Sequence, residues 1–273
     1  MKYLKIFLLV TASWYHPANV LKAQPFNRLN QHPWFLIAHR GGVVDSNAAE
    51  NSMPALQRAV EHGYYMVEVD LRTTKDGELI IQHDPDFKRY FHVNKRVTDM
   101  DWKDIRNLRS DRGGSRVLQF EEVLKYCSGK IQLMIDNKIS GNDTILFQKV
   151  VNLLSKYNLQ TKALMIGTTE STAFFTGKIR LSCTREQLEK NMQMPDYNPE
   201  NYYLFGADLT KDDVQWAVKN KILAVGVVNE WRYRRAGASQ DDIKKDIRRL
   251  TETGLQYFQI DSIFEHFFMK SGD

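Results

Sequence analysis

The sequence predicts an α/β protein, a single-domain eight-stranded β/α (TIM) barrel. Its 273 residues, 42% of them hydrophobic, are enough for one large core and match the usual length of such barrels. Short β-rich runs alternate with helical stretches, which is typical of a parallel sheet, and eight runs favour closure. An open doubly wound sheet is the alternative, but no glycine-rich phosphate-binding loop follows any run. The eight runs are residues 34–38, 64–71, 131–135, 163–166, 179–183, 202–205, 222–228 and 256–260.

The N-terminus is predicted to be a signal peptide, residues 1–23. Lys2 and Lys5 flank the apolar residues 6–10, and Ala23 provides a small residue before a cut near Gln24. Residues 24–273 would then form the barrel domain of a periplasmic or secreted protein. An apolar first helix of the fold is the alternative. The stretch is too short to span a bilayer and has no amphipathic period, so no integral membrane span is predicted.

Charge and cysteine content exclude two further possibilities. The formal net charge is +5, but without the three lysines of the leader the chain carries 35 basic and 33 acidic residues. A nearly neutral domain is a poor candidate for nucleic-acid binding, which needs a basic surface. The only cysteines, Cys127 and Cys183, are expected at opposite ends of the barrel, too far apart for a disulfide.

The first helix has clear start and stop signals. Asn51 and Ser52 are good caps, Pro54 suits the first turn, and Gly63 ends the helix. The second strand follows directly, as expected for a β/α repeat.

A hairpin is predicted after the second strand, because Asp76-Gly77 lies between two β-rich runs. If Lys75 pairs with Glu78, His83 lies opposite Asp70 and folds back over the strand end. A β-bulge would displace this register by one residue.

Polar side chains occupy the ends of the first three strands, where barrel enzymes carry their functional groups. Glu68 and Asp70, two residues apart on a strand, point to the same face with Cα atoms roughly 7 Å apart. Two such carboxylates repel unless a cation lies between them, and Asp136 can supply a third oxygen. This set suits one divalent cation, Mg²⁺ or Ca²⁺, rather than zinc. The alternative for Glu68 and Asp70 is a solvated strand edge.

Two histidines near that cation, His39 and His83, indicate a site for a phosphodiester. Histidines move protons at neutral pH, and the neighbouring Arg40 and Lys138 can bind anionic oxygens. The alternative for Arg40 and Lys138 is a structural ion network with the carboxylates.

The residues resemble the glycerophosphodiester phosphodiesterase family, within the phosphatidylinositol phospholipase C-like superfamily. Its six ordered motifs correspond to His39-Arg40-Gly41, Glu50-Asn51-Ser52, Glu68-Val69-Asp70, Asp76-Gly77, His83-Asp84 and Asp136-Asn137-Lys138. The resemblance implies a metal-dependent hydrolase that releases glycerol 3-phosphate and an alcohol from a small glycerophosphodiester. His39 and His83 would be its catalytic acid and base, and Arg40 and Lys138 would hold phosphate. The metal ligands would be Glu68, Asp70 and Asp136, with Glu50 beside the metal.

Two departures from the family pattern leave alternatives open. Asp136 replaces the usual Glu, and Gly226 stands where the family has a tryptophan of the pocket wall, which Trp231 or Tyr233 would have to replace. One alternative is a phospholipid head-group phosphodiesterase, sphingomyelinase D-like or phosphatidylinositol-cleaving, with Phe87, Tyr90 and Phe91 as exposed apolar residues. The other is a non-catalytic phosphodiester-binding protein. The basic residues Arg232, Arg234 and Arg235 are expected in a solvated loop, or against an anionic head group.

Overall fold

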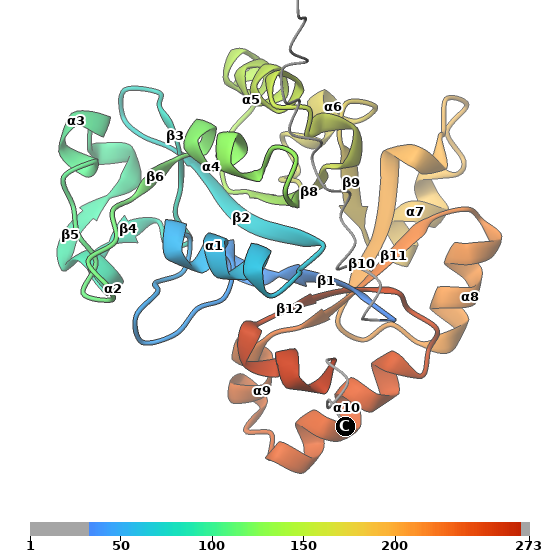
Figure 1. The fold of residues 1–273 in the computed structure, drawn as a ribbon. Helices are drawn as coiled ribbons and strands as arrows, with labels where there is room; N and C mark the ends of the chain where they lie inside the picture. Colours follow the sequence, from blue (N-terminus) through green and yellow to red (C-terminus); the bar gives the residue numbers. More distant parts are fainter. Residues whose placement is uncertain (1–32, 269–273) are drawn as a thin grey trace, which may run out of the picture.

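The computed structural model describes residues 33–268, and its core is a closed barrel of eight parallel strands. Each strand pairs with its neighbour in the order β1-β12-β11-β10-β9-β8-β7-β2, and β2 pairs with β1 to close the ring (Figure 1). All eight predicted barrel strands are therefore confirmed. The predicted leader lies outside the described residues. The barrel strands are β1 (Phe35–Ala38), β2 (Met66–Thr73), β7 (Gln132–Asn137), β8 (Leu164–Ile166), β9 (Arg180–Cys183), β10 (Tyr202–Gly206), β11 (Leu223–Val228) and β12 (Tyr257–Ile260).

Helices connect the strands and cover the outside of the barrel. The first helix begins as predicted, with Ser52 as the cap whose side chain accepts a hydrogen bond from the Ala55 amide. Cys127 ends α4 and Cys183 ends β9, and both are free thiols. The helices are α1 (Met53–Glu61), α2 (Lys88–Phe91), α3 (Trp102–Ile105), α4 (Phe120–Cys127), α5 (Thr144–Lys156), α6 (Thr172–Phe175), α7 (Arg185–Asn191), α8 (Lys211–Lys219), α9 (Glu230–Ala236) and α10 (Gln240–Thr251).

Apolar side chains form two layers because residues alternate between the faces of each strand. The barrel interior is filled by Ile37, Met66, Met134, Tyr203 and other inward residues. A larger layer between the strands and the helices holds the outward residues. Among residues 33–268, no helix combines the length and the apolar character needed to cross a membrane.

The hairpin after β2 forms, but its predicted register is wrong by one residue. Thr73 pairs with Leu79 and Leu71 with Ile81, so Gln82, not His83, lies opposite Asp70 and donates its amide to the Asp70 carbonyl. The loop has three residues, 75–77, because the Thr74 side chain binds both Asp76 and the Glu78 amide. The last loop residue, Gly77, has φ +78°, which glycine adopts without strain.

The segment between the hairpin and α4 forms a small lobe beside the barrel, on the left of Figure 1. It has its own apolar cluster, which includes Phe87, Val97 and Ile105 and packs on Ile80 of the hairpin. This core supports α2, whose Arg89 forms an ion pair with Glu50 outside the lobe. The lobe contains β4 (Asp86–Phe87), α2, β5 (Val93–Arg96) and α3, and lies between β3 (Leu79–Ile81) and β6 (Leu118–Gln119).

Candidate active site

The candidate site lies where β1, β2, β7 and β12 end, at the carboxyl edge of the barrel. The chain turns sharply after β1: Arg40 has φ +53° and its amide donates to Glu68 Oε2 at 2.7 Å. Two glycines make this turn possible. A Cβ on Gly42 would lie 2.1 Å from the Ala55 carbonyl oxygen, and one on Gly41 would lie 2.6 Å from the Asn51 Cα.

Three carboxylates predicted as metal ligands gather at the centre of this edge. Atoms of Glu68, Asp70 and Asp136 all lie within 4.8 Å of one another, because Asp70 and Asp136 are paired in register across β2 and β7. Glu68 and Asp70 are each only 1% exposed, which contradicts a solvated strand edge. Asn51 holds Asp70 by donating to its Oδ2 at 2.7 Å.

The positive charge around these carboxylates is not sufficient to balance their negative charge. Lys138 donates to Asp136 at 2.6 Å and lies 3.2 Å from Asp70 Oδ1 without the geometry of a hydrogen bond. Among the described residues, neither Asp70 Oδ1 nor Glu68 Oε1 has a hydrogen-bond partner, although both are buried. Burial, and then the charges of Asp70 and Asp136, raise the pKa of Glu68 well above its usual value.

This cluster fits the cation that the sequence implies. Two buried carboxylate oxygens without donors, beside a third carboxylate, form an all-oxygen set of the type that Mg²⁺ and Ca²⁺ prefer. Lys138 lies within the cluster, so the ion network that was one of the sequence alternatives does form. A role for Lys138 in holding phosphate stays a prediction.

His39 is held by a partner that the sequence reasoning missed. Its Nδ1 lies 2.6 Å from Asp261 Oδ1, and Asp261 Oδ2 accepts from the Glu230 amide. A carboxylate only accepts, so the His39 proton lies on Nδ1 and Nε2 faces the site. Burial opposes ionisation of Asp261, but the hydrogen bond and charge of His39 outweigh it and lower the pKa. Asp261 directly follows the last strand, so the strand-end rule already applied to the first three strands would have found it.

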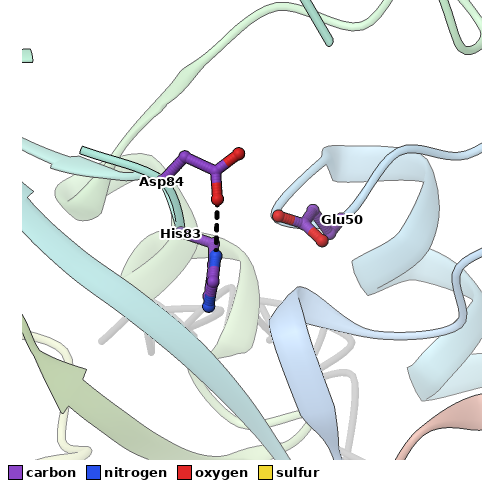
Figure 2. Close-up of side chains that lie close together, drawn as sticks. All are labelled: Glu50, His83 and Asp84. Carbon is purple, nitrogen blue, oxygen red and sulfur yellow. Dashed lines mark hydrogen bonds and ion pairs between the residues drawn. The ribbon is translucent and has the colours of Figure 1, made fainter. Parts of the chain in front are cut away.

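His83 has a similar arrangement from the lobe side (Figure 2). Its Nδ1 lies 2.8 Å from Asp84 Oδ1, and Arg40 Nη2 donates to its Nε2 at 3.1 Å. Because a guanidinium has no acceptor, Nε2 carries no proton in this arrangement. Arg72 fixes the segment by donating to the carbonyls of Gln82 and His83.

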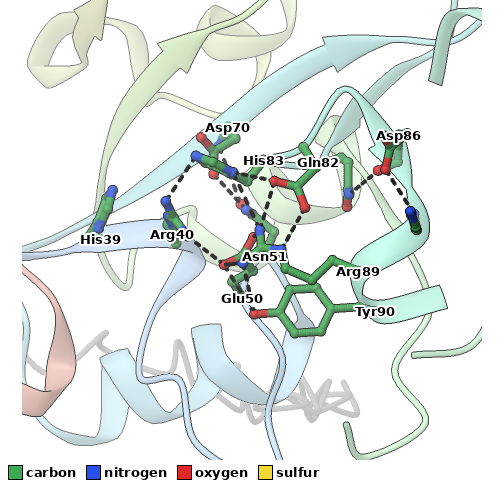
Figure 3. A network of polar contacts seen from close by, with 12 residues as sticks. His39, Arg40, Glu50, Asn51, Asp70, Gln82, His83, Asp86, Arg89 and Tyr90 are labelled. Atoms are coloured by element: carbon green, nitrogen blue, oxygen red, sulfur yellow. Dashed lines mark hydrogen bonds and ion pairs between the residues drawn. The ribbon is translucent and has the colours of Figure 1, made fainter. Parts of the chain in front are cut away.

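Glu50 lies in a different place from the one expected. It groups with His83 and Asp84 rather than with the three buried carboxylates. Its carboxylate binds Arg40 and Arg89, as the network in Figure 3 shows. Arg89 also binds Asp84. Two guanidiniums already neutralise this group. The structure therefore places Glu50 in an ion network that holds Arg40 and Arg89, and Arg89 is a further residue that no motif indicated.

Two cavities meet at His39 and Arg40. The mouth cavity, about 670 Å³, covers the barrel end and is lined by residues that include His83, Asp136 and Phe205. The side groove, about 470 Å³, lies between the lobe and α9. Both cavities share His39, Arg40 and Trp231. A phosphate bound at His39 and Arg40 would thus have one substituent in each cavity.

The predicted aromatic and basic contacts need three corrections. Phe87 and Tyr90 are buried, and Phe91 packs edge-on against Phe87, so the lobe offers no exposed apolar surface there. Gly226 faces the helical layer, because a Cβ there would meet Leu255 and Phe258. The lack of a side chain at this position therefore does not change the wall of the pocket.

The third correction concerns α9. Its basic residues lie on a helix, not in a loop, and Arg232 is paired with Asp208 and Asp246. Tyr233 is buried and donates to Asp246, whereas Trp231 lines both cavities.

Comparison with known proteins identifies the family. Residues 39–173, which contain every predicted site residue, match the model of the glycerophosphoryl diester phosphodiesterase family. The human lysophospholipase D is 30% identical over 134 residues, 45% of this chain and 41% of that protein. A glycerophosphodiester phosphodiesterase of Caldanaerobacter subterraneus is 27% identical over 141 residues, 48% of this chain and 56% of that protein. The chain thus spans about half the length of the curated relatives it matches.

Solved structures extend the likeness over nearly the whole barrel. A glycerophosphoryl diester phosphodiesterase from Parabacteroides distasonis has a TM-score of 0.69 at 15% identity, covering 91% of this chain and 94% of that one. An Oleispira antarctica phosphodiesterase in complex with the product sn-glycerol-3-phosphate has a TM-score of 0.64 at 15% identity, covering 83% and 92%. These likenesses show the TIM-barrel fold. The match of residues 39–173 to the family model leads to one conclusion: the chain belongs to the glycerophosphoryl diester phosphodiesterase family.

Proposed function

We propose that the protein is a metal-dependent phosphodiesterase that hydrolyses a glycerophosphodiester to glycerol 3-phosphate and an alcohol. One observation carries this proposal: two imidazoles, each held at Nδ1 by a carboxylate, flank Arg40 beside three carboxylates with too little positive charge. The family match and the product named for the Oleispira antarctica phosphodiesterase support the choice of substrate.

The two histidines have complementary tasks in this proposal. His83 Nε2 carries no proton and lines the mouth cavity, so it is placed to take the proton of the attacking hydroxyl. His39 lines both cavities and acts from its imidazolium form, with one proton on Nδ1 and a second on Nε2. It gives the Nε2 proton to the oxygen of the departing alcohol as the bond from phosphorus to that oxygen breaks. Asp261 and Asp84 keep each ring oriented and stabilise its charged form.

Charge on the phosphate is balanced by groups on both sides of it. Arg40 lies between the histidines and offers donors to an anionic oxygen. When bound at Glu68, Asp70 and Asp136, Mg²⁺ or Ca²⁺ supplies charge neutralisation for the phosphate oxygens. Attack by the neighbouring glycerol hydroxyl would give a cyclic phosphate first, whereas attack by water would not.

Neither alternative function is favoured by a specific contact. A phospholipid head-group phosphodiesterase needs apolar side chains at the mouth to meet the lipid surface, yet Phe87 and Tyr90 are buried. A binding protein without turnover was suggested by Asp136 and Gly226. Asp136 lies within the carboxylate cluster and Gly226 faces away from the pocket, so both reasons weaken.

An assay of product release tests the proposal. Soluble glycerophosphodiesters and phospholipid vesicles are offered to the protein with Mg²⁺ or Ca²⁺, and glycerol phosphate, cyclic phosphate and lipid products are measured. We expect glycerol phosphate from the soluble diesters. Cleavage of vesicles alone would favour the lipid enzyme, and tight diester binding without any cleavage would favour the binding protein.

A further inference from the structure

The side groove carries charges that the proposed chemistry does not use. Four of its acidic residues have a basic partner of their own: Asp45 pairs with Arg58, Glu50 with Arg40 and Arg89, Asp111 with His92, and Asp261 with His39. The guanidiniums neutralise Asp45 and Glu50 within the protein, whereas the two histidines neutralise their partners only when they are protonated.

Two guanidiniums in the groove are different. Arg112 of the lobe and Arg234 of α9 both line it, and neither forms an ion pair with a carboxylate in residues 33–268. Arg112 lies over the Tyr90 ring, 5.2 Å from its centre, which leaves the edges of its guanidinium free to donate. Glu230 is the one acidic lining residue without an ion pair in the same part of the chain.

The proposed role of His39 assigns the groove to one end of the substrate. His39 lines both cavities, whereas His83 and Asp136 line only the mouth cavity. If His39 protonates the departing alcohol, that alcohol leaves through the groove while glycerol stays over the carboxylates. The groove volume of about 470 Å³ is within the usual range of small-molecule sites.

We propose that the side groove selects a leaving alcohol that carries its own phosphate, bound by Arg112 and Arg234. This inference rests on the proposed function. Guanidiniums bind phosphate with paired, charge-assisted hydrogen bonds, and two of them without internal partners lose no existing ion pair when they do so. Trp231, 47% exposed, gives the carbon skeleton of the alcohol an apolar wall.

The test compares two diesters that differ in one group: glycerophosphoglycerol, and the same diester phosphorylated on its terminal hydroxyl. We expect the wild type to have a kcat/KM about tenfold higher for the phosphorylated diester. Arg112→Gln and Arg234→Gln should each lower that ratio severalfold, most of all together. Arg235→Gln, next to Arg234 on α9, and Arg106→Gln in the lobe are matched controls outside the groove and should keep the ratio.

Equal kcat/KM for the two diesters would overturn this inference but not the proposed function. A kcat/KM ratio that both groove variants leave unchanged would do the same. A preference for a cationic alcohol such as choline would overturn it as well and would point to Glu230. If neither diester is cleaved, the proposed function fails. Calorimetric binding to the wild type then decides the inference: tighter binding of the phosphorylated diester supports it, and equal affinity refutes it.

Discussion

Two groups of side chains that could hold a metal ion lie at the same end of the barrel, yet they differ in charge balance. The buried group, Glu68, Asp70 and Asp136, has three carboxylates, and within residues 33–268 Lys138 is its one lysine or arginine ion-pair partner. The lobe-side group, Glu50, His83 and Asp84, has two carboxylates facing two guanidiniums (Figures 2 and 3). Ligand atoms alone do not distinguish the two groups, but the neighbouring cations do.

The pKa values of the carboxylates also differ between the two groups. Burial and neighbouring carboxylates raise the pKa of Glu68. Burial also opposes ionisation of Asp84, but hydrogen bonds from His83 and Arg89 outweigh it and lower the pKa. The buried group is therefore the better candidate for an external cation, and the lobe-side group is a positioning network for His83 and Arg40.

The largest expected effect is loss of the buried group. Glu68→Gln or Asp70→Asn should lower kcat/KM by about 10³-fold, because the cation that stabilises charge in the transition state is lost. Glu50→Gln should lower activity far less and leave the metal concentration for half-maximal rate unchanged. An equal change in that metal concentration for Glu50→Gln and Glu68→Gln would break the comparison.

The next largest effect is loss of either imidazole. His39→Ala and His83→Ala should each lower kcat by about 10²-fold or more, because a proton donor or acceptor is missing. Circular dichroism and melting temperature should stay near the wild type, since both rings are partly exposed. Full activity in either variant contradicts the assignment.

A smaller effect is expected for the partners of the imidazoles. Asp261→Asn and Asp84→Asn should each lower kcat about tenfold or more with little change in KM, since each carboxylate acts through its histidine. A shifted pH profile of kcat would mark this positioning role. A change in melting temperature with an unchanged profile would mean that the contact is only structural.

The smallest effect is on stability without divalent ions. A raised folded-state pKa means that folded Glu68 holds its proton above the pH where the unfolded carboxyl loses it, so stability falls as pH rises through that window. Glu68→Gln in chelator should therefore raise the melting temperature at pH 7 by about 3 °C. Asp84 has the opposite sign: its lowered pKa adds stability at neutral pH that is lost in acid, so Asp84→Asn should lower the melting temperature. Calorimetry at pH 5 and 7 measures both, and shifts of the same sign would contradict the comparison.

Strand positions were predictable because apolar alternation and helix caps are local. Every barrel strand lies within about two residues of the run that predicted it. The hairpin register was not predictable in this way, because the Thr74 side chain, and not the Asp-Gly pair alone, determines the loop length.

The candidate site was predictable to the extent that its residues end strands. Glu68, Asp70, Asp136 and His39 gather as expected because neighbouring strands place them side by side. The position of Glu50 depends on Arg89, which lies in the lobe and has no motif of its own. The ion pair between Glu50 and Arg89 joins segments that are distant in the sequence and forms only in the folded chain. For this reason the sequence did not show whether Glu50 is a metal ligand or part of an ion pair.

Calorimetric titration of chelator-treated protein with Mg²⁺ or Ca²⁺ tests the central claim most directly. We expect one divalent ion per chain in the wild type, in Glu50→Gln and in Asp84→Asn, and none in Glu68→Gln. Binding that survives in Glu68→Gln and disappears in Glu50→Gln, or no binding to the wild type at all, would contradict it.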